Sequence, residues 1–176
     1  MNIIYGNVWK EAARAHGTVV VPTNIGYKFD AIAVMGAGVA KQAADMFPDL
    51  PKWYGGLCKQ YLDKTPVFQF NREIIVFPTK PLNHQSPQLS WKSNSSLDLI
   101  ARSAAELRNF TGQIFLPLVG CGLGEQPIDL VIPILDYFLV AKRFVLVILP
   151  DHAHRMTPCY RSRIDGEIPN ELDDTW

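Results

Sequence analysis

The chain has 176 residues, of which 48% are apolar and 19% are charged, and its 17 Lys and Arg residues balance 17 Asp and Glu residues. This length suffices for the core of a single domain, and the balanced charge excludes a protein that coats nucleic acid over its whole surface. No apolar run approaches the roughly 18 residues of a membrane span, and the amino end lacks the features of a secretory signal. We therefore expect a cytoplasmic protein without membrane contacts.

The first part of the chain alternates apolar runs with amphipathic segments. A turn-rich loop at 22–30 separates the second predicted strand from the helix that follows, and Pro48 ends that helix. The last predicted strand of this part ends at Lys80. In order, the predicted elements are strand 2–5, helix 8–15, strand 18–21, helix 37–47, helix 50–62, and a hairpin of strands 67–70 and 73–77.

The second part continues the alternation after a polar, irregular segment at 81–92. Its predicted elements are helix 96–109, strand 114–119, helix 129–140 and strand 144–149. Alternating strands and helices indicate an α/β fold, a three-layer α/β/α sandwich with a mixed, largely parallel sheet. We predict one domain over 1–150, followed by a carboxy-terminal extension, 151–176, that packs on it or trails from it.

Two glycine-bearing loops each follow a predicted strand and lead towards a helix. Ligands of such sheets bind beyond the carboxyl ends of the strands, where both loops are expected. Free backbone amides at such a loop, with the positive end of a helix dipole, can hold a phosphate. We therefore predict a clamp for a diphosphate, built from the residues Gly36, Ala37, Gly38, Val39, Gly120, Cys121, Gly122, Leu123 and Gly124.

Other chemistries of glycine loops and cysteines fit less well. Neither loop has the Walker pattern, and Lys41 stands where the dinucleotide fingerprint has its last glycine, so an NAD-dependent oxidoreductase is weakly supported. The three cysteines match neither a disulfide framework nor a metal site. Cys121 can be interpreted as a nucleophile or, as we favour, as a small residue beside a ligand. We expect no metal and no cofactor.

Four segments together resemble a macro domain, and the resemblance extends from about Ile3 to Leu149. These segments are the strand 19–21 with Asn24, the loop 35–40, the strand end 77–80 and the loop 120–124. Macro domains are three-layer α/β folds that bind ADP-ribose between two glycine loops. The resemblance implies that ADP-ribose, or DNA or protein that carries it, is the partner.

The segment Phe77-Pro78-Thr79-Lys80 is most similar to one branch of that family. This branch contains the animal terminal ADP-ribose glycohydrolase and bacterial antitoxin domains that remove ADP-ribose from DNA. A lysine matching Lys80 is catalytic there, which is chemically reasonable because a desolvated lysine can act as a nucleophile and form a Schiff base. Gly124 replaces an aspartate of the animal enzyme, as it does in the antitoxins. The adjacent Glu125 could supply a carboxylate, but we interpret it as a solvated loop residue.

Two asparagines match further positions of the family. Asn7 stands where many macro domains have an aspartate that accepts the adenine amino group, and it retains a carbonyl acceptor. Asn7 can equally cap the helix that follows it, and the two roles are compatible. Asn24 matches an asparagine that contacts the distal ribose, but a plain turn residue would look the same.

Several aromatic and basic residues are not fixed by any motif. Tyr27, Phe29 and Trp91 have rings that could stack on a base. The cations that could touch nucleic-acid phosphates, or be ordinary solvated charges, are Lys28, Lys41, Lys92 and Arg102.

The resemblance and the predicted clamp lead to one function and three alternatives. We expect an ADP-ribosyl hydrolase that removes mono-ADP-ribose from a macromolecule, with DNA favoured over protein, and with Lys80 as the catalytic residue. The first alternative is a module that binds ADP-ribose or a related nucleotide metabolite without turnover. A phosphatase acting on ADP-ribose 1''-phosphate is the second, and the weakly supported oxidoreductase is the third.

Overall fold

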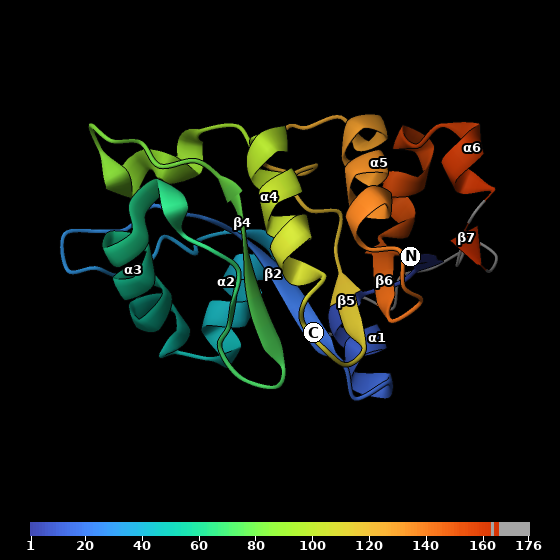
Figure 1. Ribbon diagram of the computed structural model, residues 1–176, viewed down its shortest axis with the longest axis horizontal. Helices are drawn as coiled ribbons and strands as arrows, with labels where there is room; N and C mark the ends of the chain where they lie inside the picture. Colours follow the sequence, from blue (N-terminus) through green and yellow to red (C-terminus); the bar gives the residue numbers. More distant parts are fainter. Residues whose placement is uncertain (163, 166–176) are drawn as a thin grey trace.

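A computed structural model describes residues 1–162 and 164–165 of the chain (Figure 1). The strands are β1 Asn2–Tyr5, β2 Thr18–Asn24, β3 Phe68–Gln69, β4 Ile74–Lys80, β5 Ile114–Leu116, β6 Phe144–Ile148 and β7 Ile164–Asp165. The α-helices are α1 Val8–Arg14, α2 Gly38–Met46, α3 Leu50–Tyr61, α4 Leu97–Leu107, α5 Ile128–Phe138 and α6 Pro158–Arg161, and the 3₁₀ helices are η1 Leu62–Lys64, η2 Pro87–Lys92 and η3 Pro150–Arg155.

The seven described strands form one sheet in the order β3-β4-β2-β5-β6-β1-β7. All neighbours are parallel except the hairpin of β3 and β4, which is antiparallel. The predicted hairpin is therefore confirmed, and Asn71 closes it by accepting hydrogen bonds from the amides of Glu73 and Ile74. The prediction of a mixed, largely parallel sheet is also confirmed.

Helices cover both faces of this sheet, with α4 and α5 on one side and α1, α2 and α3 on the other (Figure 1). The strand β2 shows how the sequence specifies two buried faces, because Val20 packs into the α4–α5 core and its neighbours Val19 and Val21 pack into the opposite core. Successive side chains of a strand point to opposite faces, so a strand buried on both faces is continuously apolar. The three-layer sandwich follows from this pattern.

The strands β2 and β5 each end three residues from the predicted position, and a proline lies in or directly after each of them. The strand β2 runs three residues past the predicted end at Val21, although it contains Pro22. Beyond Val19, β2 pairs only with β4, so the missing N–H of Pro22 interrupts no second ladder. The strand β5 ends at Leu116, three residues earlier than predicted, because Pro117 cannot donate to the next ladder bond.

The chain after residue 150 contributes η3, α6 and β7 to the described structure. β7 pairs with β1 through Ile3 and Ile4 and so forms an edge of the sheet. The rest of the predicted extension 151–176, residue 163 and residues 166–176, lies outside the described residues. Within the described part of the chain, no helix has both the length and the apolar character needed to cross a bilayer.

Candidate functional site

A cavity of about 560 Å³ lies at the carboxyl ends of the parallel strands. Such strand ends carry the binding sites of open α/β sheets, because the loops that leave them converge there. Both glycine loops border the cavity. Its lining residues are Pro22, Thr23, Asn24, Val34, Gly36, Ala37, Gly38, Val39, Ala40, Thr79, Lys80, Trp91, Ser95, Pro117, Leu118, Gly120, Gly122, Leu123, Gly124, Val147, Leu149 and His152.

The first glycine loop leads directly into α2, as predicted. Ala37 is the N-cap of this helix, and no described side chain caps it, so the first amides of α2 have no partner of that kind. Gly38 has a φ of +55°, which favours glycine, and Gly36 has open space where a side chain would be. The loop therefore presents bare backbone and the positive end of a helix to the cavity.

The second glycine loop is held by turns, and the helix that follows it begins within one residue of its predicted start. Glu125 donates its amide to the carbonyl of Gly122, and Gln126 donates its amide to that of Gly120. The helix α5 begins only at Ile128, after Pro127. Loop amides, without a helix dipole, are therefore what this wall offers to an anion.

Lys80 is the last residue of β4 and its side chain reaches the second glycine loop. Its Nζ donates one hydrogen bond of 2.7 Å to the carbonyl of Leu123 and another of 2.7 Å to the carbonyl of Trp91 in η2. The side chain thus connects the strand end, the polar segment after it and the glycine loop. A lysine in the cavity lining was predicted from the sequence, but its two carbonyl partners were not.

The cavity changes the acidity of Lys80. Burial lowers the pKa of its ammonium group from the ordinary value, because removal from water disfavours the charged form. The nearby carboxylate of Glu125 acts in the opposite direction and raises this pKa. Lys80 is therefore more readily deprotonated than a surface lysine, and Glu125 limits the effect.

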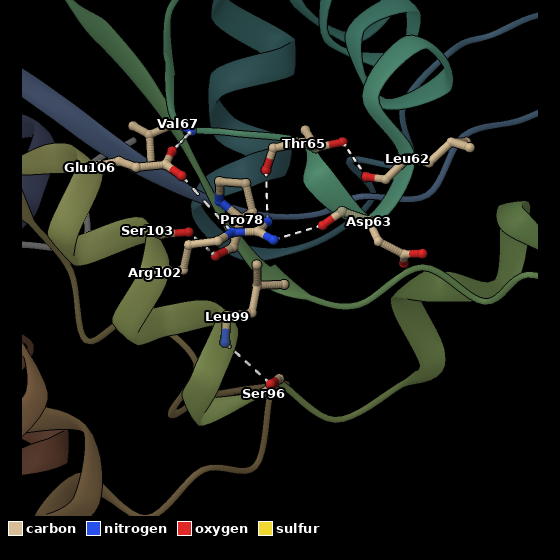
Figure 2. A network of polar contacts seen from close by, with 10 residues as sticks. All are labelled: Leu62, Asp63, Thr65, Val67, Pro78, Ser96, Leu99, Arg102, Ser103 and Glu106. Atoms are coloured by element: carbon tan, nitrogen blue, oxygen red, sulfur yellow. Dashed lines mark hydrogen bonds and ion pairs between the residues drawn. The ribbon is translucent and has the colours of Figure 1, made fainter.

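The backbone that carries Lys80 is fixed by α4 (Figure 2). The Ser103 hydroxyl donates to the carbonyl of Pro78 at 2.8 Å. The amide of Ser96, the N-cap of α4, donates to the carbonyl of Thr79. Arg102 is engaged on the same helix, where its guanidinium donates to the carbonyls of Asp63 and Thr65. Arg102 thus anchors the η1 segment, which gives it a structural role that the sequence did not reveal.

Asn24 lies at the end of β2, is buried and lines the cavity. Its Nδ2 donates to the carbonyl of Val34 at 2.7 Å, and its Oδ1 accepts from the amide of Gly26 at 2.9 Å. These are the contacts of a turn-building residue, and they hold the loop that leads to α2.

Two predicted site residues do not line the cavity. Asn7 caps α1, because its Oδ1 accepts from the amides of Trp9 and Lys10. Cys121 is fully buried and its thiol donates to the carbonyl of Val119. Burial raises the pKa of this thiol to about 12, so it stays protonated at neutral pH, which disfavours the nucleophile interpretation.

Ser95 is the residue of this site that the sequence least suggests. It precedes the N-cap Ser96, so a helix-start role explains a serine there without any reference to the cavity. Its amide donates to the carbonyl of Gly124, and a Cβ on Gly124 would lie 2.1 Å from the Ser95 hydroxyl. That hydroxyl is buried and has no hydrogen-bond partner among the described residues. Ser95 thus packs directly against the second glycine loop, and only a glycine fits at position 124.

Comparisons with known proteins give the fold a name. No protein-family model matches the chain, and no curated protein matches it. Several solved structures do match the chain. Thermosipho africanus DarTG in complex with ADP-ribose has a TM-score of 0.65 at 21% identity over 90% of this chain, which spans 43% of the DarTG chain.

Two macrodomain structures match nearly their whole length. The macrodomain of Thermus aquaticus DarG gives a TM-score of 0.62, with 22% identity over 84% of this chain and 96% of the relative. The macrodomain of Mycobacterium tuberculosis DarG gives 0.61, with 22% identity over 84% of this chain and 97% of the relative. The chain therefore has the macrodomain fold.

Proposed function

We propose that this protein is an ADP-ribosyl hydrolase that releases mono-ADP-ribose from a macromolecule, with DNA as the favoured carrier. The observation that carries the proposal is the amine of Lys80, which lines a cavity between two glycine loops and has a lowered pKa. Perturbed lysines in a cleft are candidates for nucleophilic catalysis. Gly124, which stands at the position where the DNA-directed antitoxins also have a glycine, favours DNA over protein as the carrier.

The two loops suit the diphosphate of ADP-ribose. The first presents the uncapped start of α2, and the second presents loop amides from Gly120 to Gly124. Backbone N–H groups bind phosphate oxygens without needing a positive side chain. The structure of T. africanus DarTG, which shares the fold, was solved with ADP-ribose. A ligand held this way would have its distal ribose positioned against Lys80.

The reaction starts from the neutral amine. The Lys80 nitrogen attacks the anomeric carbon of the distal ribose, and the bond to the carrier breaks. The carrier leaves with the bonding electrons and takes up the proton that the amine gives up. The sugar ring then opens to an imine on Lys80, and water hydrolyses this imine to free ADP-ribose and the starting amine. The diphosphate clamp also accelerates the reaction, because it holds the distal ribose in position against Lys80.

A module that binds ADP-ribose without turnover is the second candidate. It is favoured by the two carbonyl partners of the Lys80 Nζ, since carbonyl oxygens also stabilise a protonated ammonium. In such a module Lys80 would be a structural bridge and no imine would form.

Release of ADP-ribose from matched modified DNA and modified protein distinguishes the two candidates. We would compare the wild type with Lys80→Ala and Lys80→Arg and measure ADP-ribose binding by calorimetry. The arginine variant keeps a cation that can bridge the two carbonyls but has no nucleophilic amine. We expect both variants to lose at least about 100-fold in release while Lys80→Arg keeps binding. Binding without release by the wild type would establish the non-catalytic module instead.

A further inference from the structure

Two exposed aromatic rings stand on the segments that border the cavity. Trp91, in η2, lines the cavity and is 48% exposed, and its carbonyl accepts from the Nζ of Lys80. Phe29 lies in the loop between β2 and α2 and is 103% exposed. A single exposed apolar residue is ordinary on a protein surface. Here both rings stand on segments that contribute to the cavity lining, η2 through Trp91 and the loop after β2 through Val34.

Each of these rings is adjacent in sequence to a lysine. Lys28 precedes Phe29, and Lys92 follows Trp91 with its Nζ 5.5 Å from the centre of the indole ring. Neither lysine has an acidic partner within 4.0 Å among the described residues. An indole has two faces, and the Lys92 ammonium can cover only one of them.

The other two cations that the sequence singled out are already engaged. Lys41 forms an ion pair with Asp45 on α2, and Arg102 donates to the carbonyls of Asp63 in η1 and of Thr65 directly after it. The four candidates thus divide into two that have an ion-pair or hydrogen-bond partner and two that have no acidic partner among the described residues. The second pair, Lys28 and Lys92, is the pair beside the exposed rings.

The loop that carries Phe29 is built firmly against η2. It forms a tight hairpin in which the amide of Lys28 donates to the carbonyl of Ile32 and the amide of Ala31 donates to that of Lys28. At its base, Gly26 packs so closely on η2 that a Cβ there would lie 2.2 Å from the carbonyl of Pro87. We name the hairpin 27–33 and η2 together the rim.

The two aromatic residues of the rim, Phe29 and Trp91, are close enough for a short nucleic-acid strand to contact both. Phe29 is three residues from Gly26, and Trp91 is one residue from Ser90, which Gly26 contacts. An extended chain covers at most about 3.5 Å per residue, so the backbones at Phe29 and Trp91 lie within roughly 20 Å of each other. A few nucleotides of single strand bridge such a distance.

We propose that the rim is the surface that holds single-stranded DNA while its ADP-ribose occupies the cavity. Trp91 stacks on the base that carries the ADP-ribose, Phe29 stacks on a base further along, and Lys28 and Lys92 neutralise phosphates. Exposed rings beside basic groups are the combination that binds single strands, whereas an acidic peptide would use the lysines and leave the rings unused. The zero net charge of the chain requires such a contact to be local. This inference rests on the proposed function and specifies its carrier.

The test compares release from a mono-ADP-ribosylated oligonucleotide and a mono-ADP-ribosylated peptide. We expect Phe29→Ala to lower kcat/KM on the oligonucleotide on the order of 5- to 150-fold and to affect the peptide much less. Trp91→Ala also changes the cavity lining, so it should lower kcat/KM on both substrates, with the larger loss on the oligonucleotide. Trp91→Phe should keep most of the activity because it keeps a ring. The control is Tyr137→Ala, since Tyr137 on α5 is also an exposed aromatic but does not line the cavity.

Two further measurements keep this inference separate from the proposed function. Lys28→Gln and Lys92→Gln should each reduce the salt dependence of oligonucleotide binding by about 0.7 in log–log slope. Binding of an unmodified single-stranded oligonucleotide to the Lys80→Ala protein should weaken when either ring is removed. If the wild type releases nothing but this binding behaves as stated, the proposed activity fails and the rim surface stands. Equal losses on peptide and oligonucleotide, or unchanged binding without the rings, would overturn the rim proposal.

Discussion

The amine of Lys80 donates to the backbone carbonyl of Leu123, 43 residues away in sequence, at 2.7 Å. The carbonyl of Trp91 takes a second hydrogen bond from the same nitrogen. A neutral amine still has two N–H groups, so it can keep both contacts after losing its third proton. Its side-chain carbon and the two carbonyls then occupy three of the four tetrahedral directions. The lone pair is confined to the fourth, and in the proposed hydrolase this would orient the amine for attack.

The pH dependence of ADP-ribose release should depend on the negative charge of Glu125 beside Lys80. If the neutral amine attacks, kcat/KM rises as pH rises through the pKa of Lys80, which burial lowers and Glu125 raises. Removing the negative charge in Glu125→Gln lowers this pKa further, so the rising limb moves to lower pH. A pH profile of wild type and variant measures the shift.

The control for this experiment is Glu73→Gln. Glu73 is an exposed glutamate at the other end of β4 from Lys80, beside Arg72, and its removal should leave the limb unchanged. If the rising limb of the kcat/KM profile lies at the same pH in Glu125→Gln as in the wild type, Lys80 does not set the pH dependence.

Two buried serines should respond in opposite ways to the same substitution. Ser103 is buried and its hydroxyl donates to the carbonyl of Pro78, so Ser103→Ala should lower the free energy of unfolding by about 1–3 kcal/mol. The buried hydroxyl of Ser95 has no partner among the described residues. Ser95→Ala should therefore leave the free energy of unfolding unchanged or raise it by about 1 kcal/mol. Denaturant unfolding of both variants measures the difference, and similar losses in both would contradict it.

Neighbouring glycines of α3 provide a second matched pair. A Cβ on Gly55 would lie 2.2 Å from the carbonyl of Ala31, so Gly55→Ala should lower the free energy of unfolding by about 1–3 kcal/mol. A Cβ on Gly56 meets open space. Gly56→Ala should raise the free energy of unfolding by about 0.5–1 kcal/mol, because alanine favours a helix interior. Thermal unfolding tests both signs, and a stabilised Gly55→Ala would refute the close packing of α3 on the hairpin.

Apolar periodicity was enough to predict the layers of this fold, because each face of the sheet needs its own core. Strand ends were harder to predict. A proline is compatible with β2 only because β5 pairs with it no further than Val19, and that pairing is a property of the whole sheet. Residue patterns along one strand do not contain this information.

The candidate site was predictable where side chains or glycines mark it. The two loops, Asn24 and Lys80 line one cavity, as their positions at strand ends suggested. The carbonyl partners of Lys80 were not predictable, because every residue has a carbonyl and none is distinguished in the sequence. Ser95 was missed for a related reason, since a serine before a helix has an adequate local explanation. Asn7 has that local role and lies outside the cavity lining.

Because Gly26 packs against η2, the two parts of the rim are held together by the protein itself and not by bound DNA. Single-stranded DNA that binds such a surface loses its own conformational freedom, but it does not also have to immobilise two protein loops. Preorganised surfaces of this kind discriminate chiefly through the lifetime of the complex, because encounter rates vary little among related ligands. We therefore expect carriers that differ in their bases to differ in residence time more than in association rate.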